Sequence, residues 1–456
     1  MDRTRILPRL WLVFVLLVLL SSITAFIYFS EGRLLLAAVV VFTVALVSWR
    51  MECALYLVAF LTPLLVRSQQ LFGTEKISVA ELIVLAALCV WVGGKLRQSS
   101  FRLVATPLDV PLFLFLLLTA AASVYPLRRV SFPLAGFDSA SPLYSAKVLL
   151  DLFEAVLFYF FVADVFRIEH LRRMVAAFVV GLLASSSIGI AQYAVYLSRV
   201  KPESWFLVYD SNTVRSTLNN QNVFGMYLVL LAPLLLYLAG YYRGLKRVAI
   251  LFACALVFAA LLASHSRSAW VGFLASVVIV SSLREKNLFR GLVWAAVLFV
   301  VCASLLLVFE QTTFAAKIFR AQADVGERMS CYSRVFAVIV RNPIGIGAGT
   351  FRQQAVCGDY HHAHDLFLQV AIERGVFALV VFAYLVVVFL KAAASPELKD
   401  GYASAVRWGL TAGVVGVLVQ GLFDYPFYSQ RIALLFFFVL AAVMGVVSPA
   451  KRIAPS

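Results

Sequence analysis

Apolar runs of about 20 residues, long enough to cross the hydrocarbon core of a bilayer as helices, recur from one end of the chain to the other. Of the 456 residues, 63% are hydrophobic and 14% are charged, whereas a soluble globular domain is roughly half apolar and about a quarter charged. The excess apolar side chains must face lipid or other helices. No segment is long and polar enough for a separate soluble domain, so the sequence predicts a single all-α transmembrane domain over residues 1–456.

The spacing of these runs predicts a polytopic bundle of about 12 to 14 transmembrane helices. The second and third runs are short and could instead form a re-entrant pair. The first run follows three arginines, is long for the apolar part of a signal peptide and precedes no clear cleavage site, so we expect it to be retained. The predicted spans are 10–29, 34–48, 53–66, 79–95, 108–125, 146–166, 174–197, 222–241, 248–264, 268–283, 291–309, 366–390, 403–422 and 431–448.

Positive charges punctuate the apolar runs and predict the orientation of the chain. With the N-terminus in the cytoplasm, nearly every inner connection carries a cluster of lysine and arginine, and the outer connections are mostly sparse. We therefore expect both termini in the cytoplasm. This topology also accounts for the net charge of +16. Because no basic stripe is interleaved with exposed aromatic residues, nucleic acid is not an expected partner.

Two predicted outer segments, residues 198–221 and 310–365, break the charge rule because each carries several basic residues. Outward arginines can contact anionic lipid head groups or bind an anionic substrate, and the pattern alone leaves both open. We interpret 310–365 as one large extracytoplasmic loop with a helix over 327–341 that stops at Asn342-Pro343. The glycine-rich run 345–349 follows. No strand precedes it, so we predict a tight turn rather than a nucleotide site.

Three of the five histidines crowd together before a predicted span, as His361, His362 and His364. Histidine gains and loses a proton near neutral pH, so the cluster could supply a general base. A polar cap at the membrane interface is the alternative. A second alternative is a metal site formed by these histidines with Asp359 or Asp365. Their spacing matches neither the HExxH pattern nor a cysteine–histidine zinc pattern, so we predict no metal.

Two arginines stand out in other outer turns. Arg215 lies in a polar, amide-rich stretch, and Arg267 lies within Ser264–Trp270 at the start of another span. A guanidinium at membrane depth is costly unless it is paired, and its planar fork can grip phosphate oxygens. Several such forks around one cavity would suit a pyrophosphate. Contact with lipid phosphates remains the alternative for each arginine alone.

Two of the cysteines, Cys331 and Cys357, fall in the large loop. An oxidising compartment would allow them to pair. The sequence does not give their separation, so the disulfide remains an open question.

These motifs together resemble the O-antigen ligase/polymerase family. The family shows an arginine with an aromatic residue four positions on, a proline-led glycine turn, and a His-Asn pair before a leucine–glutamine helix start with a later Glu-x-Gly. Two departures are Asp365, where asparagine is usual, and Gln221, where proline is usual. The matching segments, which cover roughly residues 210–450, are 214–222, 266–270, Arg328 with Tyr332, 342–351, 362–369, and Glu373 with Gly375.

The resemblance implies a membrane glycosyltransferase that needs neither metal nor cofactor. It would move a glycan from undecaprenyl pyrophosphate to a hydroxyl of lipid A-core, on the periplasmic side of the bacterial inner membrane among its lipids. The resemblance implies that Arg215 and Arg267 bind the donor pyrophosphate and that Arg328 supports that site or positions the acceptor. It makes His364 the catalytic base and gives His362 an orienting role.

Two other functions remain open. A polymerase of the same family would use the same donor and extend a growing glycan. A transporter or flippase for the lipid-linked glycan belongs to another class and predicts charged residues within spans and internal repeats. The sequence instead gathers its charges at the outer face and shows no clear repeat.

Overall fold

The computed structural model describes residues 16–17, 19–20, 23, 33–64, 69–71, 75–98, 103–127, 142–198, 214–218, 220–285, 314–358, 360–395, 398 and 400–447. The predicted span 291–309, most of the span 10–29, both chain ends and Asp359 lie outside these residues. Nothing in the structure therefore tests those predictions.

The described residues form a helical bundle, which confirms the predicted all-α polytopic class. Within them, the strands are limited to one antiparallel pair of three residues each, β1 (Gln69–Leu71) and β2 (Glu75–Ile77). Eight of the described helices are long and apolar enough to cross a membrane. They are α4 (Val79–Arg97), α7 (Leu171–Ser198) with the preceding turn η1 (Ile168–His170), α8 (Gln221–Tyr241), α9 (Gly244–Ala263), α10 (Arg267–Glu285), α14 (Val376–Ala393), α15 (Gly401–Gln420) and α16 (Gln430–Val447).

Four further helices correspond to predicted spans, two of them closely and two with differences. Two, α2 (Arg33–Trp49) and α5 (Asp109–Leu127), follow the prediction closely. The helix α3 (Cys53–Leu61) has nine residues, too few to cross a bilayer, so 53–66 is wrong as a full span. The helix α6 (Pro142–Val165) has the length of a span but carries charged side chains within it, as described below.

The predicted span 366–390 is also wrong, because the chain breaks into α13 (Leu366–Arg374) and α14. Gly375 separates the two helices with φ of 91°, in the region that favours glycine. The turn after α12 packs directly against this break: a Cβ on Gly345 would lie 2.6 Å from the Gly375 nitrogen. Each glycine makes room for the backbone of the other, which fixes the glycine-rich turn to the α13–α14 junction.

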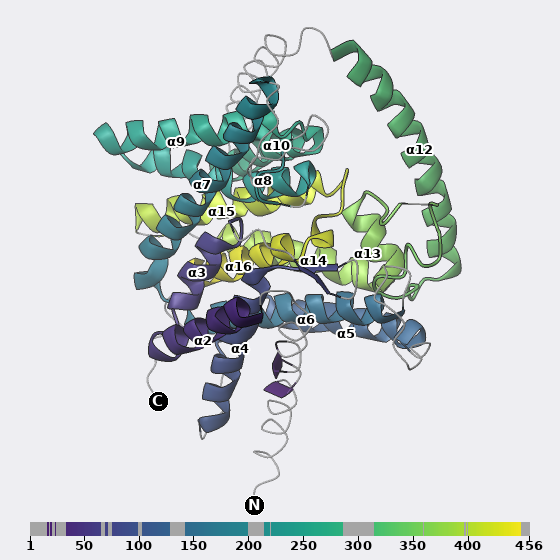
Figure 1. Ribbon diagram of the computed structural model, residues 1–456, viewed down its shortest axis with the longest axis horizontal. Coiled ribbons are helices and arrows are strands. Elements are labelled where there is room, and N and C mark those ends of the chain that lie inside the picture. Colours follow the sequence, from purple (N-terminus) through teal and green to yellow (C-terminus); the bar gives the residue numbers. More distant parts are fainter. Residues whose placement is uncertain are drawn as a thin grey trace, which may run out of the picture.

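Three helices form the centre of the bundle. Figure 1 shows α14, α15 and α16 between the helices α7–α10 and the pair α5 and α6. Close packing at the centre depends on glycines of α15. A Cβ on Gly409 would lie 2.7 Å from the Leu234 Cα atom of α8, and Gly272 of α10 meets the Gly416 carbonyl just as tightly. Such contacts hold the ends of α8, α10 and α15 at fixed separations.

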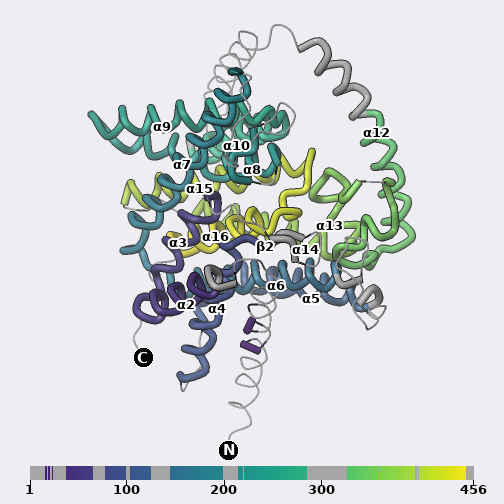
Figure 2. The backbone as a smooth tube through the Cα atoms, viewed as in Figure 1, coloured from purple at the N-terminus to yellow at the C-terminus, as the bar shows by residue number. Residues whose placement is uncertain are grey.

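The helix α12 (Phe314–Arg341) runs along one edge of the bundle toward α13 (Figure 2). It ends where the sequence predicts, before Asn342-Pro343, but it begins earlier than residue 327. Its apolar side packs with the chain that follows in a small second core, which includes Val335, Ile346, Phe351 and Ile372. The large loop is thus a folded unit attached to α13.

Candidate active site

The histidine-rich loop, residues 360–365, is shaped by the helix that follows it. The Asp365 carboxylate caps α13 by accepting a hydrogen bond from the Leu368 amide at 2.8 Å. One turn on, the Gln369 side-chain oxygen accepts from the Ala363 amide at 2.7 Å. Asp365 is thereby engaged as a helix cap, and the carboxylate that meets the histidines comes from elsewhere.

A disulfide fastens the loop from its other side. Cys331 of α12 and Cys357 are bonded, so the pairing that the sequence left open is present. Next to Cys331, the Tyr332 hydroxyl donates to the His364 carbonyl at 3.2 Å. The position of His364 is therefore set jointly by α12 and α13.

Asp424, in the connection between α15 and α16, is the carboxylate that meets the histidines. Its Oδ1 atom lies 3.6 Å from His364 Nδ1 and 4.0 Å from His362 Nε2. The Asp424 residue is only 5% exposed. Sequence reasoning missed this residue. The available signal was a lone acidic residue in the short connection between the predicted spans 403–422 and 431–448.

Burial affects the two sides of this contact differently. Burial raises the pKa of Asp424, but the His364 side chain and the nearby His362 outweigh it and hold that pKa below its ordinary value. Burial lowers the pKa of His362 to about 4, with a further lowering from the charges of His364, His361 and Arg328 against the opposing Asp424. At neutral pH, Asp424 is therefore a carboxylate and His362 a neutral ring.

One hydrogen bond and two longer contacts with Asp424 indicate which nitrogen of each ring carries the proton. The His364 amide donates to His362 Nδ1 at 3.3 Å, so the proton of neutral His362 sits on Nε2, toward Asp424. His364 turns Nδ1 toward the same carboxylate, which favours a proton there and leaves Nε2 with a lone pair. His364 can therefore accept a proton on Nε2 while Asp424 stabilises the resulting cation.

His364 also adopts a backbone conformation that is uncommon for a residue with a side chain. Its φ is 52°, and Ser216, next to Arg215, and His265, close to Arg267, have similar values of 53° and 57°. Conformations of this kind cost free energy and cluster at functional sites. Three of the segments singled out from the sequence thus share the same local strain.

Arg328 joins the histidine site through the Asp424 segment. Its Nη1 atom donates to the Phe423 carbonyl at 3.2 Å. One turn before the disulfide, α12 thus places a guanidinium next to the carboxylate that faces both histidines. The structure brings Arg328, His362 and His364 together.

Arg215 lies on a separate loop, residues 214–218, which α7 holds in place. The Gln192 side-chain oxygen accepts from the Ser216 amide at 2.8 Å and from the Arg215 amide at 3.3 Å. The Gln192 amide group returns a hydrogen bond to the Ser216 carbonyl at 2.8 Å. A buried glutamine thus fixes the backbone of Arg215, whose side chain is half-buried.

Arg267 is the first residue of α10 and is exposed. The preceding Ser266 donates to the Asn222 side chain at 2.9 Å, and Gln420 at the end of α15 donates to the Asn222 carbonyl at 3.4 Å. The segment 420–424 is therefore connected through Asn222 to the Arg267 turn at one end and contacts the histidine site at the other. This segment, which we call the bridging segment, links the two candidate sites.

A further arginine, Arg431, was overlooked because it falls at the start of a predicted span. It is 3% exposed at the beginning of α16, and its Nη1 donates to the Thr217 carbonyl at 3.2 Å. Arg431 therefore contacts the short loop, residues 214–218, that carries Arg215. Polar residues from α4, α6 and α16 lie in the same region: Glu81 and Glu154 are buried, and the half-buried Gln430 donates to the Glu154 carboxylate at 3.2 Å.

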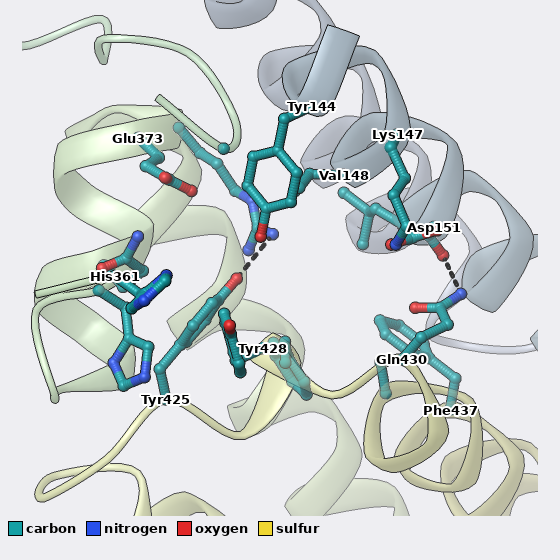
Figure 3. A pocket seen from close by; sticks show the side chains of 17 residues that line it. Tyr144, Lys147, Val148, Asp151, His361, Glu373, Tyr425, Tyr428, Gln430 and Phe437 are labelled. Atoms are coloured by element: carbon teal, nitrogen blue, oxygen red, sulfur yellow. Dashed lines mark hydrogen bonds and ion pairs between the residues drawn. The ribbon is translucent and has the colours of Figure 1, made fainter. Parts of the chain in front are cut away.

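These buried groups correct one expectation from the sequence. Charges do occur inside predicted spans, since α6 carries Lys147, Asp151 and Glu154. A cavity beside His362 is lined by the first two of them together with Gly349 of the glycine turn, whose φ is 72° (Figure 3). The glycine turn thus forms part of a cavity wall. Lys147 and Asp151 of α6 thus share this cavity with the histidine loop, whereas Glu154 accepts a hydrogen bond from Gln430.

Three side chains meet closely enough to share a metal ion. The nearest donor atoms of His362, His364 and Asp424 all lie within 4.8 Å of one another. This set differs from the combination with Asp359 or Asp365 considered from the sequence. Contacts with Asp424, Tyr425 and Tyr428 also account for how the rings lie, and a metal-free reaction stays a prediction.

The comparisons with known proteins bear on the same region. A family model described as O-antigen ligase matches residues 252–383. The matched segment contains Arg267, Arg328, His362 and His364, and it ends before Asp424. No curated protein matches the chain. The match confirms the resemblance drawn from the motifs: residues 252–383 are similar to the O-antigen ligase family, and the long apolar helices indicate a multi-pass membrane protein.

Proposed function

We propose that this protein transfers a glycan from undecaprenyl pyrophosphate to a hydroxyl of lipid A-core, on the periplasmic side of the bacterial inner membrane. The observation that carries the proposal is the contact between His364 and Asp424, in a region where several arginines gather at the ends of helices. A base and a set of fixed cations are the two elements that such a transfer needs. The family match supports the reaction class.

The proposed reaction begins at the acceptor hydroxyl. His364 Nε2 takes the proton as the hydroxyl oxygen forms a bond to the anomeric carbon of the donor, and Asp424 stabilises the imidazolium. The bond from that carbon to the pyrophosphate oxygen breaks, and undecaprenyl pyrophosphate leaves with the electron pair. His362, whose ring centre lies 4.3 Å from that of His364 and which approaches the same carboxylate oxygen, orients the pair. No metal or cofactor takes part.

The arginines act on the leaving group. Arg215 and Arg267 hold the donor pyrophosphate, and we add Arg431 to this set because it shares the 214–218 loop with Arg215. Fixed guanidinium groups stabilise the negative charge that grows on the pyrophosphate, without the cost of reorganising water. Arg328, next to Asp424, supports this site or positions the acceptor.

Transfer by the purified protein tests the proposal. The full chain in lipid nanodiscs is mixed with lipid-linked glycan and lipid A-core, and the product is followed by gel mobility and mass spectrometry. We expect transfer by the wild type and none by His364→Ala. A folded His364→Ala variant that transfers at the wild-type rate would overturn the assignment. A wild type that only moves donor between leaflets would instead identify a transporter.

Polymerisation of repeat units is the second candidate, because it uses the same donor and the same family motifs. A deletion strain separates the two. Loss of a ligase leaves lipid-linked polymer without attachment, whereas loss of a polymerase leaves a single repeat on the core.

A further inference from the structure

The cavity beside His362 has walls unlike those of a lipid-facing groove. Its volume is about 50 Å³, several times the roughly 10–15 Å³ that one water molecule needs. Figure 3 shows Tyr144, Lys147 and Asp151 on one side and Glu373, Tyr425 and Tyr428 on the other. Polar groups from α6, α13 and the turn η3 (Pro426–Tyr428) thus converge on one small enclosed space.

Arg374, the last residue of α13, lines this cavity and is only 3% exposed. Its Nη2 atom donates to the Tyr425 hydroxyl at 3.1 Å, and the guanidinium lies 5.3 Å from the centre of the Phe115 ring. Its Nε and Nη1 atoms are buried and have no hydrogen-bond partner among the described residues. A buried guanidinium with unused donors is costly, so the arrangement implies a ligand for them.

The other charged groups on these walls already have partners. Lys147 and Asp151 form an ion pair at 2.6 Å. The Glu373 carboxylate accepts from the Phe351 amide at 3.2 Å, turned toward the glycine-rich turn. The positive charge of Arg374 is therefore the one in this cavity whose donors remain unused within the described part of the chain.

We propose that this cavity is an acceptor subsite that binds an anionic substituent, a carboxylate or a phosphate, carried by the acceptor sugar. The subsite rests on the proposed function and deepens it, because it names a chemical feature of the acceptor. Guanidinium N–H groups pair strongly with oxyanions. The neighbouring Glu373 carboxylate interacts electrostatically with Arg374, but it accepts no hydrogen bond from the Nε and Nη1 groups.

The position of the cavity fits an acceptor rather than the donor pyrophosphate. Tyr425 links Arg374 to the His362 ring, since its hydroxyl accepts the Arg374 hydrogen bond and its ring centre lies 5.9 Å from that of His362. His362 in turn contacts the carboxylate that faces His364. A sugar with its anionic group in the cavity therefore presents a neighbouring hydroxyl toward the base. Tyr144 and Tyr428 supply rings against which a sugar face can pack.

Binding of small sugars tests the subsite directly. The probes are methyl glucuronide, glucose 6-phosphate and methyl glucoside, titrated into the purified full chain in detergent and followed by ligand-observed NMR. We expect the wild type to bind at least one anionic sugar about tenfold more tightly than the neutral glucoside. Whichever anionic sugar binds more tightly relative to the glucoside identifies the substituent as a carboxylate or a phosphate.

Three variants sharpen the result. Arg374→Gln should bind all three sugars equally, and Arg374→Lys should keep part of the preference. Arg407→Gln is the matched control, since Arg407 is also buried and lies against a tryptophan ring, on α15; it should keep the full preference. Equal binding of the three sugars by the wild type, or an unchanged preference in Arg374→Gln, overturns the subsite.

His364→Ala separates this proposal from the proposed function. If it transfers no glycan but still prefers the anionic sugar, both stand. Transfer by that variant rejects the proposed function, whereas an inactive His364→Ala together with an unchanged preference in Arg374→Gln rejects only the subsite.

Discussion

His364 Nδ1 lies 3.6 Å from Asp424 Oδ1, although the helices α13, α14 and α15 separate the two residues in the chain. The contact favours a proton on Nδ1, which leaves Nε2 with a lone pair for the base role that we propose. It also gives the histidine cluster a carboxylate partner that does not come from its own loop.

Asp424→Asn should lower the transfer rate roughly 10²- to 10⁴-fold, because an amide favours the wrong ring tautomer and cannot stabilise the imidazolium. Asp365→Asn is the matched control, one residue from His364. Asparagine caps a helix as well as aspartate does, so its rate should stay within about twofold of wild type. The measurement is initial transfer velocity at saturating donor. Equal losses in both variants would contradict a specific role for Asp424.

Lowering the pH from 7 to 5 should destabilise the protein through His362. Its pKa is about 4 in the folded chain, against 6.5 for a histidine exposed to water in the unfolded chain. Between these two pH values, only the unfolded chain takes up the proton. The loss is of order 2 kcal/mol at pH 5. Asp424, whose pKa is lowered, adds a loss in the same direction only at more acid pH.

Thermal unfolding in detergent measures this loss. His362→Gln, which cannot take up the proton, should show a smaller fall in midpoint between pH 7 and pH 5 than the wild type. An identical fall in the two proteins would rule out His362 as its source.

Arg431→Gln should reduce transfer about 10²- to 10³-fold, as Arg215→Gln does, if both guanidinium groups hold the pyrophosphate. Arg334→Gln is the control, because Arg334 is exposed on α12. The measurement is kcat/KM for the lipid-linked donor. A loss in Arg215→Gln with none in Arg431→Gln would confine Arg431 to supporting the 214–218 loop.

Breaking the disulfide should loosen the large loop. The bond closes a segment of 26 residues, for which the chain-entropy estimate is roughly 3 to 4 kcal/mol. The Cys331→Ala/Cys357→Ala variant should therefore unfold at a lower temperature than the wild type and lose transfer activity at a lower temperature. Cys254→Ala removes a cysteine that forms no disulfide and should behave as wild type. Unchanged heat stability in the double variant would mean that the second core alone holds the loop.

Removal of divalent metal ions should leave the rate unchanged, since the proposed reaction uses arginines where many phosphate-handling enzymes use a metal. The assay compares enzyme treated with EDTA and passed over chelating resin with untreated enzyme. A loss of activity that zinc or manganese restores would instead assign His362, His364 and Asp424 as metal ligands.

The sequence predicted the elements that depend on local patterns. Apolar runs gave nearly all the described helices, and the Asn342-Pro343 stop placed the end of α12 correctly. The break at Gly375 was missed because apolar residues continue through it, and only the close approach of Gly345 shows why the helix must end there.

The site was predicted in part for a similar reason. Histidines and arginines in polar turns can be recognised from the sequence alone, so Arg328, His362 and His364 were predicted as candidates, and the structure brings them together. Asp424, Arg374 and Arg431 are recognised by what they face across the bundle: a histidine ring, an enclosed cavity and the carbonyl of Thr217. Pairings between helices far apart in the chain leave no periodic signal in a single sequence.

The bridging segment, residues 420–424, has a consequence for timing. It hydrogen-bonds Asn222 beside the Arg267 turn through Gln420, and it carries the carboxylate that sets the His364 ring. Under the proposed function, this short turn would join the place where the donor binds to the place where the base acts. A donor that shifts the turn on binding would also reset the His364 ring, so the lipid intermediate would be protected from hydrolysis until both substrates are bound.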